Sequence, residues 1–288
     1  MIMHFKPQNP GLPLAFGSTL AYSTLNVAVR LQLDGPLTAW GILILRGAFG
    51  LAVLGLAAVI LRKNLLGRNP RLLLAIGFCG FLSAVCVILA IREIPLYQAM
   101  VMLYLYPALT VPLNFLVNST KVGRRDILLV LLAFVGGLFL IWPDSAAGLH
   151  VGIYHLAGLG GALTFALSLV LTARLGDDNC GLEPLFHYSL WAFAGTLLIA
   201  LACGEPIGLD SPRAVLSGLG LAVLAVAAIV MAYAALRWVA PFKVGVIGTL
   251  EIFFGALASW LVFDDPITVR ALIGGLIILG VALKLRQS

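Results

Sequence analysis

Charged residues are scarce in this sequence. Asp, Glu, Lys and Arg make up only 10% of its 288 residues, whereas a soluble domain carries roughly 25%. Too few charges remain to cover a water-facing surface, and 61% of the residues are hydrophobic. We therefore expect the outer surface to face lipid, as in an integral membrane protein.

The sequence also lacks the patterns of several kinds of site. Its four cysteines show no paired spacing, so neither a disulfide framework nor a zinc motif is indicated. It contains no Walker motif, no HExxH and no GxSxG. We expect no cofactor, no metal, no catalytic residues and hence no enzyme. The net charge of +6 is spread in small clusters between apolar runs, which does not indicate nucleic-acid binding.

Long apolar runs fill the chain instead. A spanning helix needs about 20 residues plus a connection, and the continuous runs exclude an alternating outer-membrane barrel. We predict an all-α integral membrane fold of ten transmembrane helices, with a lipid bilayer as its surroundings. The predicted spans are 13–30, 36–61, 71–91, 95–118, 125–142, 151–174, 183–203, 212–236, 241–263 and 267–285.

Basic residues predict the orientation of these spans. With a cytoplasmic N-terminus, 13 of the 18 basic residues fall on the cytoplasmic side: Lys6, Arg62, Lys63, Arg68, Arg71, Lys121, Arg124, Arg125, Arg174, Arg237, Lys243, Lys284 and Arg286. Only Arg30, Arg92, Arg213 and Arg270 fall outside, and Arg46 lies within a span. This positive-inside bias predicts a multi-pass protein of the bacterial inner membrane with both termini in the cytoplasm.

The pattern of spans restarts near the middle of the chain. The stretch from Pro95 to Trp142 resembles that from Pro241 to Arg286: a proline-led span, a polar turn, then a glycine-rich span. We predict two repeats of five helices, 1–145 and 146–288. Because five is odd, the second repeat is inverted relative to the first, which predicts a central substrate cavity between the halves.

Two ionisable residues stand deep inside apolar spans. Arg46 and Glu251 each lie ten residues from the start of a span, about 15 Å into a hydrocarbon core roughly 30 Å thick. A lone charge there costs at least about 2.5–3.5 kcal/mol, so each needs a partner or water. Two interpretations stay open. Arg46 binds a substrate carboxylate while Glu251 binds a proton or an ammonium group, or the two residues form a structural ion pair.

The fourth span combines aromatic residues with helix-breaking ones. Pro107 and Pro112 each remove a backbone N–H, which favours a kinked helix lining a pathway. Tyr97 and Tyr104 are seven residues apart and share a face, whereas Tyr106 points elsewhere. A second aromatic set stands in the other half. The predicted substrate-binding residues are Tyr22, Asn26, Arg46, Tyr97, Tyr104, Tyr106, Phe165, His187, Trp191, Tyr233 and Glu251.

Several of these motifs occur in the same order in a known superfamily. They are Tyr22-Ser23-Thr24, Arg46, the string Tyr104-Leu105-Tyr106-Pro107-Ala108-Leu109-Thr110, and Leu250-Glu251. On these residues the chain resembles the drug/metabolite transporter superfamily, in particular its EamA branch and the YddG-type amino-acid exporters. The resemblance covers nearly the whole chain. It implies a secondary transporter that exports amino acids, including aromatic and neutral ones, and related metabolites by alternating access, and that functions as a monomer. The alternative is a multidrug or organic-cation exporter of the same superfamily that uses Glu251.

Overall fold

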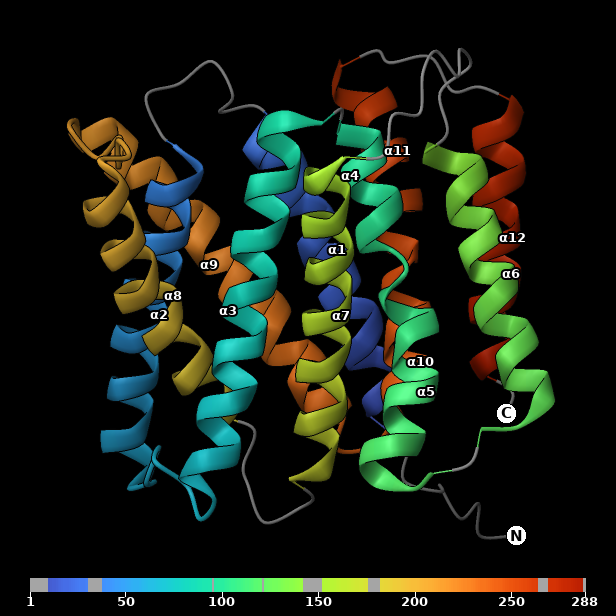
Figure 1. Ribbon diagram of the computed structural model, residues 1–288, viewed down its shortest axis with the longest axis horizontal. Helices are drawn as coiled ribbons and strands as arrows, with labels where there is room; N and C mark the ends of the chain where they lie inside the picture. Colours follow the sequence, from blue (N-terminus) through green and yellow to red (C-terminus); the bar gives the residue numbers. More distant parts are fainter. Residues whose placement is uncertain are drawn as a thin grey trace, which may run out of the picture.

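Helices account for the regular structure of the protein. The computed structural model describes residues 10–30, 38–94, 96–120, 122–141, 152–175, 182–263 and 269–286, and within these ranges it contains twelve helices and no strand (Figure 1). The helices are α1 (Gly11–Arg30), α2 (Ala39–Leu61), α3 (Pro70–Glu93), α4 (Leu96–Leu103), α5 (Tyr106–Asn118), α6 (Arg124–Ile141), α7 (Ile153–Arg174), α8 (Leu182–Cys203), α9 (Pro212–Ala235), α10 (Pro241–Gly248), α11 (Leu250–Phe263) and α12 (Val269–Arg286).

Most of the predicted spans correspond to one helix each. Eight of them match a single helix with bounds that differ by at most three residues. Seven described stretches are long and apolar enough to cross a membrane. They include the segments Ala99–Asn118 and Pro241–Val262, each of which takes in two consecutive helices. The protein is therefore an all-helical membrane protein, and the full count of ten crossings stays a prediction.

The fourth predicted span is two helices rather than one. Helix α4 ends at Leu103, and α5 begins at Tyr106. Pro107, the second residue of α5, has no N–H to donate to the carbonyl of Leu103, so one regular helix hydrogen bond is missing at this point. This interruption lies at the first of the two predicted kinks. At Pro112, the second, α5 runs on without ending, and a kink within the helix there stays a prediction.

The ninth predicted span is also interrupted, and the sequence analysis missed this break. Helices α10 and α11 are separated by Thr249, where no proline is present. The Thr249 hydroxyl donates to the Val246 carbonyl over 2.6 Å, and its N–H points at the carbonyls of Gly245 and Val246 over 3.2 Å each. These bonds across three residues tighten the turn, and a threonine hydroxyl competes in this way with the regular helix bonds.

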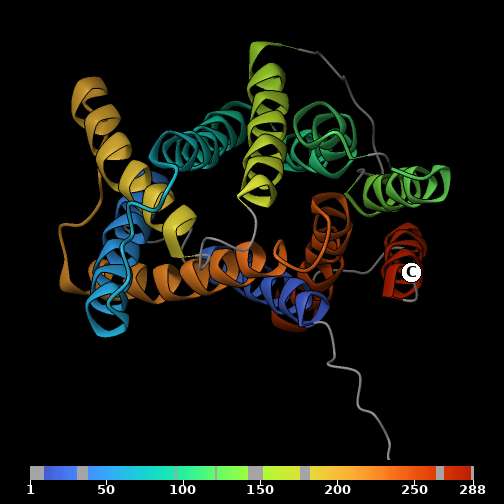
Figure 2. The same cartoon turned by 90° about the horizontal axis from the view of Figure 1, so that it is seen from below.

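Packing between the first six helices and the last six follows a reciprocal pattern. Helix α1 packs against α9 and α7 against α3, while α2 packs against α8 and α6 against α12. If α1–α6 are exchanged in order with α7–α12, the same set of packed pairs results. Viewed from below, α6 and α12 lie side by side at one edge of the molecule (Figure 2). The remaining helices surround the centre, where the candidate site lies.

Candidate substrate-binding cavity

A cavity of about 310 Å³ lies at the centre of the helix bundle. Every described helix except α6 and α12 contributes to its wall. Most of the lining is aliphatic or aromatic, and its only charged side chains among the described residues are Arg46 and Glu251. A mostly apolar hollow with few polar groups is typical of small-molecule sites, and this volume lies at the small end of their range of about 300–1,000 Å³.

The cavity gathers most of the residues predicted for substrate binding. Its lining includes Tyr22, Arg46, Tyr104, Tyr106, Phe165, Tyr233 and Glu251. Asn26 is not part of the lining but bonds to Glu251. His187 and Trp191 lie away from the cavity, and the side chain of Tyr97 lies outside the described part of the chain. Seven of the eleven predicted residues, taken from seven different helices or breaks, thus meet in one place.

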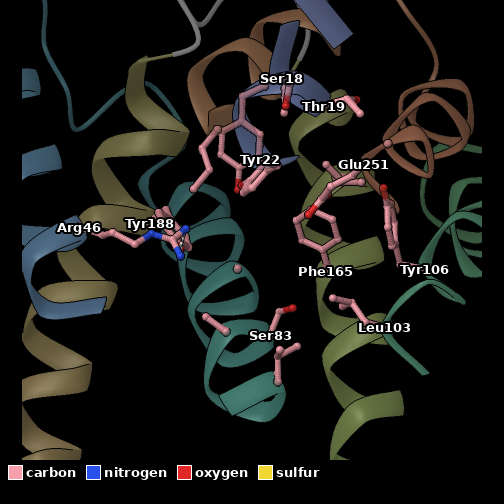
Figure 3. Close-up of a pocket in the computed structure, with 18 of the residues that line it drawn as sticks. Ser18, Thr19, Tyr22, Arg46, Ser83, Leu103, Tyr106, Phe165, Tyr188 and Glu251 are labelled. Atoms are coloured by element: carbon pink, nitrogen blue, oxygen red, sulfur yellow. Dashed lines mark hydrogen bonds between the residues drawn. The ribbon is translucent and has the colours of Figure 1, made fainter. Parts of the chain in front are cut away.

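Arg46 lies on one side of the cavity, next to Tyr188 of α8 (Figure 3). One terminal N–H of its guanidinium donates to the Tyr188 hydroxyl over 3.2 Å. Its Nε is buried, and no described group accepts a hydrogen bond from it. Arg46 also lines the cavity, so the wall of this apolar hollow carries a guanidinium whose one side-chain hydrogen bond among the described residues goes to Tyr188.

Glu251 lies on the other side, near Phe165 and Tyr106 (Figure 3). The Asn26 side-chain amide donates to its carboxyl over 2.7 Å, and the Tyr104 hydroxyl also forms a hydrogen bond with it. Neither contact brings a cation. Of the two interpretations left open by the sequence, the structural ion pair has no contact in support among the described residues, because Arg46 and Glu251 each have neutral hydrogen-bond partners of their own. The cavity therefore holds a cation and a carboxyl group that do not neutralise each other.

A polar stripe on α1 holds the break between α10 and α11. Thr19 donates to the carbonyl of Ile247 over 3.3 Å, and Ser23 donates to the carbonyl of Glu251 over 3.0 Å. Asn26 continues the stripe to the Glu251 carboxyl. Spacings of four and three residues place these side chains on one face of the helix. The stripe supplies partners to the carbonyls around the break, which apolar surroundings would leave unsatisfied.

Comparison with known proteins assigns this architecture to a family. Residues 9–142 and 152–285 each match the EamA-like transporter family. The chain belongs to this family. The membership confirms the resemblance to the EamA branch that the sequence motifs indicated, and it makes the protein a membrane transporter of small molecules rather than an enzyme.

Individual relatives of this EamA-like transporter agree with the assignment. The pseudopaline exporter CntI of Pseudomonas aeruginosa is 24% identical over 96% of both chains. A protein of Archaeoglobus fulgidus described as an uncharacterized transporter is 25% identical over 77% of this chain and 78% of its own length. One crystal structure of a protein matches with a TM-score of 0.79 over 96% of this chain and 99% of that chain, and at 18% identity it shows a shared fold.

Helix α8 presents a different residue to the cavity than the sequence predicted. His187 and Trp191 share a face, as their spacing of four indicates, but this face packs on α3. The rings of Phe78 and Phe81 lie 5.1 and 6.3 Å from that of Trp191, and the His187 backbone lies against Gly77. Tyr188, one residue further along the helix, reaches the cavity of the transporter instead.

Small hydroxyl residues of the lining were missed as well. Ser18 and Thr19 of α1 and Ser83 of α3 border the cavity. Ser83 donates to the Gly161 carbonyl over 2.8 Å, so it also joins α3 to α7. The polar stripe on α1 was a readable signal for Thr19. A lone serine such as Ser83 in an apolar span gives no such signal, because it can satisfy its hydroxyl within its own helix.

Tyr106 connects the two broken segments across the cavity. Its hydroxyl donates to the Gly245 carbonyl of α10 over 3.1 Å, and its ring packs edge-on against Phe165 at 4.8 Å. We expect Tyr106→Phe to lower the stability of the transporter by about 1 kcal/mol, because the buried Gly245 carbonyl loses one of its two donors and keeps only the N–H of Thr249. The melting temperature in detergent measures this. Tyr154→Phe, at an exposed position of α7, is the matched control, and equal melting of both variants would contradict the expected role.

Proposed function

We propose that this EamA-like transporter exports amino acids and related small metabolites across the bacterial inner membrane. The observation that carries the proposal is Arg46. A guanidinium in the wall of a mostly apolar cavity, with one side-chain hydrogen bond among the described residues, is suited to a carboxylate. The aromatic and aliphatic remainder of the wall suits the uncharged side chains of neutral and aromatic amino acids.

The arrangement of the helices supports a cycle of alternating access. We infer two five-span halves of opposite orientation, residues 1–145 and 146–288, that expose the cavity to each side of the membrane in turn. The reciprocal packing of the first and last six helices supports this, as do two interrupted spans at corresponding positions. Ten crossings leave both termini in the cytoplasm, as the distribution of basic residues indicates. Helices of a single chain line the described cavity, which supports function as a monomer.

The direction of transport rests on similarity. The CntI protein, which is matched over nearly its whole length, is named as an exporter. We infer the same direction for this chain.

Glu251 supports a second candidate function, export of organic cations. An unneutralised carboxyl in a cavity with aromatic walls can attract a cationic dye or drug. The two candidates differ in which charged residue the cargo contacts: Arg46 for an amino acid and Glu251 for an organic cation.

Counterflow in proteoliposomes separates the two candidates. Vesicles containing the purified transporter are loaded with an unlabelled compound and offered the labelled form, for neutral and aromatic amino acids and for cationic dyes in parallel. We expect exchange of amino acids and none of dyes, with protein-free vesicles as the control. Exchange of dyes without amino acids would overturn the proposal.

A further inference from the structure

Tyr188 of α8 lines the cavity directly beside Arg46 (Figure 3). We propose that its phenol hydroxyl is a second donor to the cargo, so that Arg46 and Tyr188 together bind the two oxygens of one carboxylate. This inference rests on the proposed amino-acid function and adds a ligand to its binding site.

The hydrogen bond between the two side chains fixes which of them donates. A guanidinium carries N–H donors and no acceptor, so the bond of 3.2 Å from Arg46 ends on the phenol oxygen of Tyr188. The O–H of the phenol then has to find an acceptor elsewhere. Tyr188 forms no other hydrogen bond with the part of the chain that the structure describes. Its hydrogen is therefore available to a group in the cavity.

Close packing against two neighbouring helices holds Tyr188 in place. On the α3 side, a methyl group at Gly77 would lie 2.8 Å from the backbone nitrogen of Tyr188, and one at Gly80 would lie 2.8 Å from its ring carbon Cδ2. On the α2 side, Gly47, which follows Arg46, approaches the backbone of α8 in the same way. These contacts fix the guanidinium and the phenol relative to each other, and a preorganised pair loses little freedom when it binds.

A carboxylate is the ligand that suits this pair of donors. Both of its oxygens accept hydrogen bonds, and bonds to an ionised oxygen are roughly twice as strong as those between neutral groups. An ammonium group has no lone pair and cannot accept from either donor. A doubly charged phosphate would need a second cation, whereas Arg46 is the only basic side chain among the described residues of the lining.

Tyr188→Phe tests the proposal because it removes the hydroxyl and keeps the ring. Loss of a hydrogen bond to a charged group raises the half-saturating concentration about tenfold. We expect this rise in counterflow of a neutral amino acid and equally of its deaminated acid, because both carry the carboxylate. The maximum rate stays unchanged, since only binding is weakened. Tyr154→Phe, at an exposed position of α7 outside the cavity lining, is the matched control and behaves as the wild type.

A double variant separates direct contact with the cargo from support of Arg46. If the Tyr188 hydroxyl binds the carboxylate itself, Tyr188→Phe raises the half-saturating concentration further in a protein that already carries Arg46→Ala. An unchanged value in that background would overturn the proposal, because Tyr188 would then only position the guanidinium.

Other results also contradict binding of the carboxylate by Tyr188. They are an unchanged half-saturating concentration in Tyr188→Phe, a lower maximum rate alone, and a rise for the amino acid without one for the deaminated acid. Should Tyr188→Phe fail to fold, Gly80→Ala replaces it, because the added methyl group displaces the ring; the same rise is expected, and unchanged counterflow would overturn the proposal. Absence of amino-acid counterflow in the wild type rejects the proposed function itself, together with this role of Tyr188.

Discussion

Arg46→Ala is expected to reduce amino-acid counterflow by about 10- to 150-fold while leaving the protein folded. Hydrogen bonds to a charged group contribute about 1.5–3 kcal/mol each, and 1.4 kcal/mol corresponds to a tenfold change in binding. Among the described residues the guanidinium forms one side-chain hydrogen bond, to Tyr188, so its removal costs little structure beyond that contact. We measure initial rates of counterflow across a range of amino-acid concentrations.

Two further variants separate charge from geometry at this position. Arg46→Lys keeps the charge but loses the planar pair of N–H donors, so we expect an intermediate rate. Arg213→Ala is the control. It removes an exposed arginine at the start of α9 that is not among the residues lining the cavity, so we expect this variant to exchange amino acids at the wild-type rate. Wild-type counterflow by Arg46→Ala would show that the cargo carboxylate does not contact this residue.

Gly47→Ala is expected to lower the stability of the folded protein more than Tyr106→Phe does. A methyl group at Gly47 of α2 would lie 2.8 Å from the Cα of Phe193 in α8 and closer still to its backbone nitrogen. Backbone atoms of a packed helix cannot move aside as a flexible side chain does. Overpacking of this kind costs about 1–3 kcal/mol, and separation of α2 from α8 would also pull Arg46 away from Tyr188.

Helix α2 supplies the control for this substitution. Gly55 has no atom within 4 Å of the position that a methyl group would occupy. Gly55→Ala is therefore expected to be neutral or to stabilise the helix by up to about 1 kcal/mol. Melting temperatures in detergent compare the two variants with the wild type. If Gly47→Ala melts at or above the temperature of Gly55→Ala, the close approach of α2 and α8 is not as the structure describes it.

Helix positions could be predicted because each membrane-spanning helix needs a long run of apolar residues. Apolar runs and the charges between them locate the helices to within a few residues, and Pro107 marked the break that precedes α5. The break at Thr249 could not be predicted, because it depends on a hydroxyl that turns back on its own helix and on carbonyls that α1 satisfies from far away in the sequence. Such a break becomes visible only when the neighbouring helix is in place.

The candidate site was predictable in its residue types more than in its contacts. Intramembrane Arg46 and Glu251 stood out because charge at that depth is rare, and both line the cavity. Their hydrogen-bond partners could not be predicted, because the same sequence is compatible with an ion pair between them and with two separate sets of neutral partners. His187 and Trp191 were predicted to line the cavity in place of Tyr188 for a related reason. Successive residues of a helix are about 100° apart around its axis, and the position of α3 decides which face of α8 meets the cavity.

Counterflow with three compounds that share one side chain and differ in their charged groups tests the role of Arg46 in the cavity most directly. The wild-type transporter is offered a labelled amino acid, its methyl ester, which keeps only the positive charge, and its deaminated acid, which keeps only the carboxylate. Binding through Arg46 predicts that the amino acid and the deaminated acid exchange and that the ester does not. Exchange of the ester at the rate of the amino acid, with none of the deaminated acid, would contradict a carboxylate site at Arg46 and favour recognition by Glu251.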